Sequence, residues 1–491
     1  MSQTFLAFDL GAETGRAILG QLDSRGRLEI KEIHRFPNGI ANVLGNLHWD
    51  VLRLYRETVT ALEICATHHG TRPASIGVDT WGLDFALLDE RGHLLGNPFA
   101  YRDPRTDGIM EEVFQHVSRE RMYELTGIQL MPMNTVFQLY AMVRDGSPQL
   151  EVARDLLFIP DLLNYFLTGT KKSEYTFATT SQLLSPGTRT WQKEIFQRLG
   201  IPLSLMQEIV DPGTLLGELT EPLGKHTGLG PVPVIAVASH DTASAVAAVP
   251  ASGEDIAYIS SGTWSLVGIE SPEPIINQKS LTHNFTNEGG VGNRVRFLKN
   301  VMGLWLLQEC RRAWAREQDH SYEQLVQEAE HAPHFRSLID PDCLDFLTPP
   351  DMTRAIADFC TCTSQPVPET RGQYVRCVLE SLAFAYRRTL DQVQDVTDRR
   401  AERIHIIGGG TNNALLCQMT AHACGVPVYA GPSEATAVGN LLVQAMAFGR
   451  ISSLEELRQV VRDSFGMAVY EPQECSEWEE PFARFLELTH N

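Results

Sequence analysis

The sequence predicts an α/β protein with two domains. The chain has 491 residues, of which 43% are hydrophobic, and one hydrophobic core rarely extends over more than about 250–300 residues. Two stretches, one starting at Phe5 and one at Asp255, share the pattern of a strand, a glycine turn and a second strand. This repeat suggests two related halves with a nucleotide between them. The segment Pro250-Ala-Ser-Gly is typical of a domain junction, and we place the domains at residues 1–247 and 248–491.

The composition excludes several classes of protein. Lys and Arg number 41 against 61 Asp and Glu, a net charge of −20, which opposes binding to nucleic acid or to an anionic membrane. No apolar run approaches the ~18 residues of a membrane span, and the N-terminus lacks the basic segment of a signal peptide. Nine cysteines, an odd number, favour reduced thiols in a cytoplasmic protein, and none has the spacing of a zinc site. An anionic substrate such as a nucleotide would need a metal ion and local Arg or amide donors.

The first strand–turn–strand stretch contains a candidate phosphate site. Gly11 and Gly15 permit a tight turn that β-branched residues would resist. Backbone amides from Ala12 to Arg16 could cradle a phosphate, with Asp9 at the end of the strand facing a bound cation. The alternative is an ordinary hairpin that binds nothing.

A second polar turn follows the next predicted strand. A helix is expected over residues 50–67, where apolar residues recur at helical spacing, and a strand with a turn follows from Ser75. The turn holds Asp79, Trp81 and Gly82. A Trp face beside a glycine turn packs well on the C–H surface of a sugar, whereas a Trp buried in the core is the competing interpretation.

Asp241 lies where a predicted strand gives way to a predicted helix. Residues 231–236 form a short β-branched run, and small apolar residues suited to a closely packed helix follow Asp241. In open α/β sheets, residues just beyond the strand ends face the ligand. We interpret Asp241 as a general base that deprotonates a sugar hydroxyl. Asp is also among the preferred helix N-caps, so a purely structural capping role is the alternative.

The second half of the chain supplies further candidate features. The repeat predicts a second phosphate-facing turn around Gly262 and Thr263. Residues 297–314 predict a loop that passes into a helix, and residues 374–396 predict a long helix whose apolar stripe belongs to the core. Residues 403–416 predict a buried strand, a triple glycine and a helix with Asn near its start. Three glycines let the backbone approach a flat ligand such as adenine, with helix-start amides beside the phosphates.

Taken together, these motifs resemble those of the FGGY carbohydrate kinases, which belong to the actin/hexokinase-like superfamily. The segment Ser239-His-Asp-Thr-Ala-Ser-Ala and the late triple glycine are part of the resemblance. Six further motifs are similar and occur in the family's order: Asp9-Leu-Gly-Ala-Glu-Thr-Gly-Arg, Asp79-Thr-Trp-Gly-Leu-Asp-Phe, Tyr101-Arg-Asp-Pro-Arg-Thr, Ser260-Ser-Gly-Thr-Trp-Ser-Leu, Thr286-Asn-Glu-Gly-Gly and Leu298-Lys-Asn-Val-Met-Gly-Leu-Trp-Leu-Leu-Gln. They span most of the chain, and six motifs in order leave little room for chance.

The resemblance implies a two-domain α/β fold of the actin/hexokinase-like (ribonuclease H-like) ATPase type with a central cleft. Residues 1–247 would form the N-terminal sugar-binding and catalytic domain, and residues 248–491 the C-terminal nucleotide-binding domain. Asp241 matches the family's proton acceptor. The matches to ATP contacts are Ala12, Glu13, Thr14, Gly15, Arg16, Thr263, Gln308 and Gly409, and the matches to sugar contacts are Gly82, His240, Asp241, Thr242 and Asn300. The Glu13-Thr14 pair departs from the family, in which Ser is more usual.

The activity that the resemblance implies is ATP-dependent phosphorylation of a ketose. The motifs are most similar to those of the branch that acts on the 1-hydroxyl of L-rhamnulose, in L-rhamnose catabolism. Mg²⁺ would enter with ATP and bridge phosphate oxygens near Asp9. Another ketose such as L-fuculose or D-xylulose is an alternative substrate, and a non-catalytic, actin-like ATP-dependent sensor is an alternative function. We expect a cytoplasmic monomer or weak homodimer that binds the sugar and ATP, and neither nucleic acid nor membrane.

Overall fold

The structure is a computed structural model that describes residues 2–253, 256–316, 318–473 and 475–489. Asp255, which opens the second predicted strand–turn–strand stretch, lies outside these residues. The chain divides into two compact units, neither of them continuous in sequence. Unit 1 comprises Met1–Pro250, Glu270–Phe297 and Ala435–Ser464, and unit 2 comprises Ala251–Ile269, Leu298–Glu434 and Phe465–Asn491. Two segments from the later half of the chain thus belong to the unit built mainly from the earlier half.

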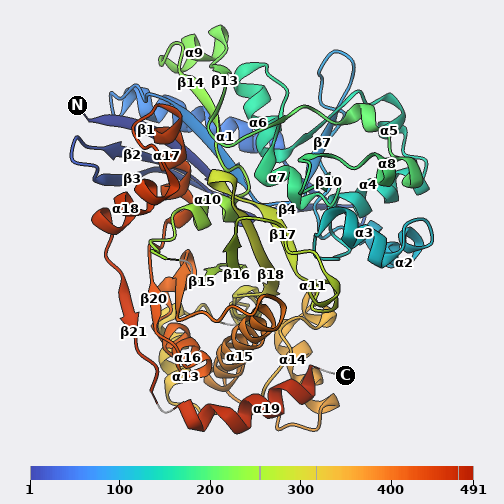
Figure 1. The fold of residues 1–491 in the computed structure, drawn as a ribbon, viewed down its shortest axis with the longest axis vertical. Coiled ribbons are helices and arrows are strands. Elements are labelled where there is room, and N and C mark those ends of the chain that lie inside the picture. The colour runs from blue at the N-terminus through green and yellow to red at the C-terminus, as the bar shows by residue number, and fades with distance from the viewer. Residues whose placement is uncertain (1, 254–255, 317, 474, 490–491) are drawn as a thin grey trace. The chain divides into compact units, whose positions relative to one another are not determined.

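A six-stranded sheet forms the centre of unit 1 (Figure 1), with the order β13-β14-β6-β1-β2-β3. β2 lies antiparallel to β1 and β3, whereas β6 lies parallel to β1 and β14. Every residue of β6 is buried, as is typical of a central strand covered on both faces. The strands are β1 (Gln3–Leu10), β2 (Thr14–Leu22), β3 (Leu28–Pro37), β6 (Ile76–Thr80), β13 (Thr214–Glu218) and β14 (Pro233–Ala236).

Two helices rich in small residues, α10 (Asp241–Ala247) and α17 (Ala435–Ala447), pack closely together in unit 1. In Figure 1 the red α17 lies beside the blue β1, although the two come from opposite ends of the chain. A Cβ atom on Gly439 would lie 1.8 Å from the carbonyl oxygen of Ser244, so only glycine allows this approach. A β-bridge between Thr80 and His240 joins the end of β6 to the start of α10.

The remaining helices and strands of unit 1 complete it. They are β4 (Ile40–Val43), β5 (Asn46–Trp49), α1 (Val51–Thr67), β7 (Phe85–Leu88), α2 (Ile109–Phe114), α3 (Arg119–Thr126), α4 (Thr135–Arg144), α5 (Pro148–Val152), β8 (Asp155–Phe158), α6 (Ile159–Thr168), β9 (Ser173–Glu174), α7 (Tyr175–Thr180), β10 (Leu184–Ser185), β11 (Thr190–Trp191), α8 (Lys193–Leu199), β12 (Ile209–Val210), α9 (Glu221–Thr227), α11 (Gln278–Thr282), β17 (Thr286–Gly289) and α18 (Leu454–Ser464). The expected helix over residues 50–67 is confirmed by α1, whose N-cap is Asp50.

A seven-stranded sheet has the order β17-β18-β16-β15-β19-β20-β21. Besides β17, given above, its strands are β15 (Ile256–Ser261), β16 (Trp264–Ser271), β18 (Val295–Met302), β19 (Arg403–Ile407), β20 (Val428–Ala430) and β21 (Ala468–Tyr470). The series β18-β16-β15-β19-β20 repeats the order β3-β2-β1-β6-β14 of the first sheet, with an antiparallel hairpin followed by parallel strands. The predicted relation between two halves is therefore confirmed at the level of topology.

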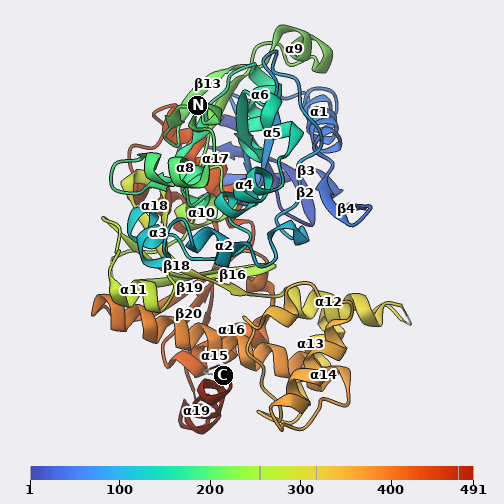
Figure 2. The ribbon, with the colours of Figure 1, turned by 90° about the vertical axis from the view of Figure 1, so that its right-hand side faces the viewer.

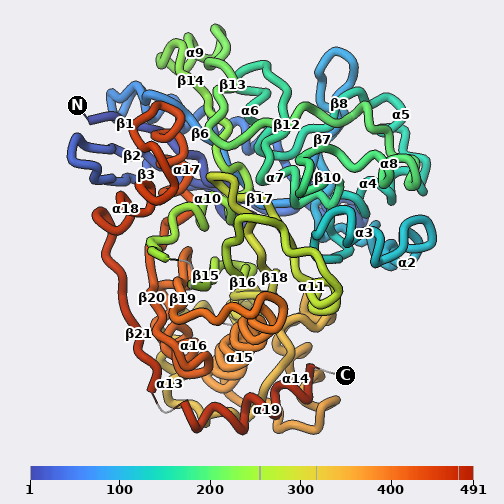
Figure 3. Tube along the Cα trace, viewed as in Figure 1, coloured from blue at the N-terminus to red at the C-terminus, as the bar shows by residue number. Residues whose placement is uncertain are grey.

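Six α-helices lie in the described part of unit 2. They are α12 (Trp305–Trp314), α13 (Tyr322–Glu330), α14 (Met352–Cys362), α15 (Arg371–Thr397), α16 (Ala414–Cys424) and α19 (Glu479–Leu488). Figure 2 shows α14 beside α12, and the tube in Figure 3 shows α15 running along α16. The helix expected over residues 374–396 is confirmed by α15, and most of its apolar stripe is buried. Within the described residues, no helix is both long enough and apolar enough to cross a bilayer.

At three places the structure can be compared directly with a local expectation from the sequence: residues 297–302, Gly15 and Trp81. Residues 297–302 belong to β18, so the expected loop is wrong: Phe297 and Val301 are fully buried, and strand pairing satisfies the backbone there. Gly15 is not at a positive φ. It is required because a Cβ atom would lie 2.3 Å from the ring of Phe36. Trp81 is 5% exposed and its ring centroid lies 4.2 Å from that of Trp49, the packing that the core interpretation predicts.

Candidate active site

Two carboxylates lie side by side at the carboxyl ends of β1 and β6 in unit 1. Asp9 and Asp79 are partners in the parallel register of these strands. Asp9 is 4% exposed and forms an ion pair with Arg16, at 2.5 Å between Oδ2 and Nη2. Arg16 stands opposite Asp9 on β2. Asp9, which was expected to face a bound cation, is therefore a direct neighbour of Arg16, the last residue of the predicted phosphate turn.

Asp79 is a fully buried acid that the sequence placed in a polar turn without assigning it a role. Burial raises its pKa well above the usual range, and the charges of Asp9 and Asp241 raise it further. Asn440 of α17 donates a hydrogen bond to Asp79 Oδ2 at 2.5 Å. Asn440 accepts in turn from Gln444, at 2.7 Å. This polar network ties α17 to the end of β6. The sequence could not reveal this contact, because α17 lies so far along the chain from Asp79.

Asp241 is the first residue of α10, and the N-cap is His240, whose side chain makes no capping bond. Asp241 Oδ1 accepts the N–H of Thr242 at 2.6 Å and its hydroxyl at 3.2 Å. Asp241 Oδ2 takes no hydrogen bond from any residue that the structure describes. The side chain is 30% exposed. The carboxylate thus satisfies one helix-start donor with one oxygen and keeps the other available for a proton.

A buried carboxyl holds the backbone that leads into Asp241. Glu174 Oε2 accepts the N–H of Ser239 at 3.0 Å. Thr176 Oγ1 donates to the same oxygen at 2.6 Å and accepts the N–H of His240 at 3.3 Å. Burial raises the pKa of Glu174 to about 7. Sequence reasoning missed Glu174, because its link to Asp241 exists only in three dimensions.

The His240 ring sits in a buried polar cluster. Its Nδ1 lies 3.2 Å from Nη2 of Arg296 and 3.4 Å from Oε2 of Glu288, and Arg296 and Glu288 form an ion pair at 3.1 Å. Its Nε2 lies 3.4 Å from Oδ1 of Asp241. A Cβ atom on Gly82 would lie 3.2 Å from Nε2. The structure therefore brings together four predicted sugar-site residues, including Thr242, and adds the Glu288–Arg296 pair that sequence reasoning missed. In the sequence, the only indication of this pair was the motif Thr286-Asn-Glu-Gly-Gly, which contains Glu288.

The predicted phosphate turn of unit 1 is only partly a loop. Ala12 and Glu13 lie outside both strands, and the turn is closed by the N–H of Gly11, which donates to the carbonyl of Thr14 at 2.9 Å. Thr14, Gly15 and Arg16 belong to β2, where they pair with β3. The sequence thus placed the turn correctly and overstated its length.

In unit 2, Thr263 lies in the turn between β15 and β16, beside the start of α12. Its carbonyl accepts the N–H groups of Gly303 and Trp305, at 3.1 and 3.2 Å. Gln308 lies one turn further along α12, and its Oε1 is buried with no hydrogen-bond partner among the described residues. A buried polar atom without a partner is costly, so Gln308 is suited to bind a ligand's donor group.

The triple glycine lies against the end of β15 in unit 2. Gly408 has φ +83°, a conformation that favours glycine. A Cβ atom on Gly410 would lie 2.0 Å from the hydroxyl of Ser261, whereas one on Gly409 would meet no atom within 4 Å. Gly408 and Gly410 are therefore needed for the fold, and Gly409 faces open space. Asn300, the remaining predicted sugar residue, lies on β18 and is half-buried.

The arrangement suits a metal ion that arrives with phosphates better than a metal held by protein alone. Among the residues described, no group of three or more His, Cys, Asp or Glu side chains could hold a metal ion. Mg²⁺ commonly binds through one or two carboxylates together with substrate phosphates. Asp9, at the carboxyl end of β1, supplies one such carboxylate. All nine cysteines are free thiols.

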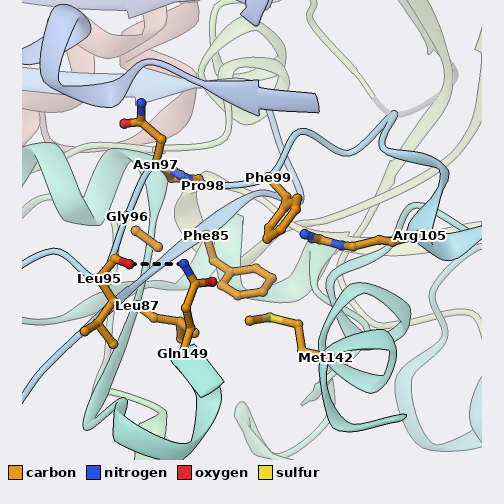
Figure 4. A pocket seen from close by; sticks show the side chains of 11 residues that line it. Phe85, Leu87, Leu95, Gly96, Asn97, Pro98, Phe99, Arg105, Met142 and Gln149 are labelled. Carbon is orange, nitrogen blue, oxygen red and sulfur yellow. Dashed lines mark hydrogen bonds between the residues drawn. The ribbon is translucent and has the colours of Figure 1, made fainter. Parts of the chain in front are cut away.

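One cavity in unit 1 offers no alternative active site (Figure 4). Apolar side chains such as Phe85, Leu87 and Met142 line it, together with Arg105 and Gln149. Gln149 donates to the carbonyl of Leu95 at 3.0 Å, and the Arg105 guanidinium lies over the ring of Phe99. The cavity lining contains no acid, base or nucleophile.

Comparison with known proteins gives consistent relatives over the whole chain. Residues 4–248 match the N-terminal domain, and residues 257–448 the C-terminal domain, of the FGGY family of carbohydrate kinases. A rhamnulokinase of Bacteroides thetaiotaomicron is 48% identical over 485 residues, covering 99% of both chains. A rhamnulokinase of Bacillus subtilis is 39% identical over 470 residues, covering 96% of both chains.

Solved structures share the fold at low sequence identity. A ligand-bound xylulose kinase from Lactobacillus acidophilus has a TM-score of 0.81 at 17% identity, covering 99% of this chain and 98% of its own. A glycerol kinase from Plasmodium falciparum with ADP has a TM-score of 0.78 at 13% identity, with the same coverage. The predicted two-domain α/β fold is confirmed by these similarities.

Proposed function

Because this chain belongs to the FGGY family of carbohydrate kinases, we propose that it transfers the γ-phosphoryl group of MgATP to the 1-hydroxyl of L-rhamnulose, in L-rhamnose catabolism. The sugar oxygen forms a bond to the γ-phosphorus as the bond from that phosphorus to the β,γ-bridging oxygen breaks. The hydroxyl proton passes to the protein, and the products are L-rhamnulose 1-phosphate and ADP.

The observation that carries the proposal is the state of the Asp241 carboxylate. Oδ1 is held by Thr242, while Oδ2 takes no hydrogen bond within the described residues. In our proposal Oδ2 accepts the hydroxyl proton as the oxygen–phosphorus bond forms, an effect of about 10²–10⁴ in rate. A general base must be oriented before the reaction, and the contacts of Oδ1 provide that orientation.

The relatives support the choice of sugar. Curated rhamnulokinases are 39–48% identical to this chain over nearly its full length. We propose that Gly82, His240, Thr242 and Asn300 contact the sugar. His240 and Thr242 flank the base, and Gly82 lies against the His240 ring, which supports a sugar site at the start of α10.

ATP is the proposed phosphoryl donor, with Mg²⁺ entering as part of MgATP. Proposed contacts to the nucleotide are Ala12, Glu13, Thr14, Gly15, Arg16, Thr263, Gln308 and Gly409. Two observations support this assignment: the open space at Gly409, and Gln308 Oε1, which has no hydrogen-bond partner in the part of the chain that the structure describes. Mg²⁺ neutralises charge on the transferring group, and we propose that Asp9 faces it. Arg16 offsets the charge of Asp9 within unit 1.

We further propose that the enzyme acts in the cytoplasm as a monomer or weak homodimer and binds no nucleic acid. Nine free thiols support a reducing compartment, and the net charge of −20 opposes binding to nucleic acid.

ADP release from MgATP across a panel of sugars tests the proposal. The panel contains L-rhamnulose, L-fuculose, D-xylulose, L-ribulose and a control without sugar. We expect turnover to be strongest with L-rhamnulose. Faster turnover with another ketose such as L-fuculose would contradict the substrate and retain the chemistry. ADP release that no sugar accelerates would favour the alternative, an ATP-dependent sensor.

A further inference from the structure

We propose that the buried ion pair of Arg296 and Glu288 positions the sugar site by fixing the His240 ring. In this proposal Arg296 makes Nδ1 the acceptor and so places the ring's proton on Nε2, where the ring offers an N–H donor to an oxygen of the bound sugar. The inference rests on the proposed function, since it assigns His240 to the sugar.

The pair is built into the interior of unit 1. Arg296 is 0% exposed and Glu288 is 4% exposed. Arg296 Nε donates to the carbonyl of Gly289 at 2.8 Å, which orients the guanidinium. Burial alone would raise the pKa of Glu288, but the charge of Arg296 holds it below its usual value. Glu288 is therefore an anion that balances the buried cation beside His240.

The hydrogen-bond geometry at Nδ1 selects the tautomer. The guanidinium of arginine can only donate, and Nη2 of Arg296 lies 3.2 Å from Nδ1 of His240. Nδ1 must then be the acceptor, so the ring carries its proton on Nε2. Glu288 Oε2 also lies 3.4 Å from Nδ1, but it makes no hydrogen bond of good geometry with a described residue. Its role is to neutralise Arg296.

The opposite tautomer would disturb the proposed base. Nε2 lies 3.4 Å from Oδ1 of Asp241, so a lone pair on Nε2 would face a carboxylate oxygen. With the proton on Nε2, this contact is attractive. At 3.4 Å it is long for a hydrogen bond, which leaves the N–H able to bind a sugar hydroxyl or carbonyl oxygen next to the reacting hydroxyl.

The first test is NMR of the full-length protein with ¹⁵N-labelled histidine rings, with the His240 signals assigned by their loss in His240→Gln. We expect an N–H at Nε2 and an unprotonated Nδ1. In Arg296→Met the donor to Nδ1 is lost and Glu288 remains as an acceptor, so we expect the proton to move to Nδ1. In Glu288→Gln the donor remains, and we expect the wild-type pattern.

The second test separates the sugar from the nucleotide in steady-state kinetics. A hydrogen bond from a charged group contributes about 1.5–3 kcal/mol, so Arg296→Met should lower kcat/KM for the sugar about 10–100-fold. We expect the KM for ATP to stay within about twofold. Glu380→Gln is the matched control, because Glu380 and Arg376 form another buried ion pair, at 2.7 Å, within α15. It should leave the KM for the sugar unchanged.

The outcomes separate this inference from the proposed function. A wild-type protein that phosphorylates no sugar refutes the proposed function, while the NMR spectrum still decides the tautomer. A proton on Nδ1 of His240 in the wild-type protein overturns the inference, even if Arg296→Met fails to fold. Unchanged sugar kinetics in a folded Arg296→Met protein also overturn it.

Discussion

Replacing the proposed base by its amide, Asp241→Asn, separates chemistry from helix capping. The amide oxygen of Asn can accept the N–H and hydroxyl of Thr242 as Oδ1 does now, at 2.6 and 3.2 Å. The amide cannot accept a proton from the sugar. We therefore expect turnover to fall by about 10²–10⁴, equivalent to roughly 3–5 kcal/mol in the activation free energy.

The expected change in the free energy of unfolding is small because two effects oppose each other. Loss of a negative charge in the first turn of α10 costs about 0.3–1 kcal/mol. Loss of that charge also removes its repulsion of the buried Asp79, whose pKa burial raises first and Asp241 raises further. The net change should stay within about 1 kcal/mol, which corresponds to a shift in Tm of no more than about 2–4 °C.

The assay is ADP release at saturating MgATP and L-rhamnulose, with Tm measured on the same preparation. Asp351→Asn is the matched control, because Asp351 caps α14 by accepting from Thr353 and Arg354 and lies outside the proposed site. It should keep wild-type turnover. Turnover of Asp241→Asn within about threefold of wild type would refute the base assignment. A fall in turnover accompanied by a large loss of Tm would favour the capping role.

Three further predictions follow from the site geometry. Gly409→Ala should fold normally, because a Cβ atom there meets only open space, and should raise the KM for ATP, because that space is the proposed nucleotide site. Gly410→Ala should instead lower Tm. A lowered Tm in Gly409→Ala together with an unchanged Tm in Gly410→Ala would contradict the assignment. Gly82→Ala should raise the KM for the sugar in kinetic assays, because its Cβ atom would lie 3.2 Å from Nε2 of His240; an unchanged KM would remove Gly82 from the site. Burial raises the pKa of Glu174 from 4.5 to about 7, so its contribution to stability is present below pH about 4.5 and is lost as the pH rises through about 7. Glu174→Gln removes that loss. The free energy of unfolding of the wild type relative to the variant should therefore fall between pH 5 and pH 8 by up to about 3 kcal/mol, and the difference in Tm should narrow accordingly. A difference in Tm that stays constant with pH would contradict the raised pKa.

Much of the site was accessible from local sequence patterns. Asp9 and Asp241 were found because Asp9 lies at the end of one buried strand and Asp241 follows another, where α/β proteins place ligand-binding residues. The triple glycine was found because glycine is distinctive, although the sequence did not separate Gly408 and Gly410, which the fold requires, from Gly409, which faces open space. Gly15 was recognised for turn flexibility, whereas its real constraint is the ring of Phe36.

The partners of these residues were not accessible, because they come from distant segments. Asp79 is held by Asn440 of α17, a helix near the end of the chain that packs in unit 1. His240 is held by Glu288 and Arg296, which lie on strands that follow about 50 residues later.

By itself, the sequence determined the fold class, the repeated strand–turn–strand order and the positions of the acidic and glycine-rich motifs. These depend on hydrophobic periodicity and on backbone conformation, which neighbouring residues specify. The tertiary structure alone decided which oxygen of Asp241 remains available, why the pKa of Asp79 is raised and how His240 is oriented. Burial and hydrogen bonding set these properties, and both depend on residues brought together only when the chain folds.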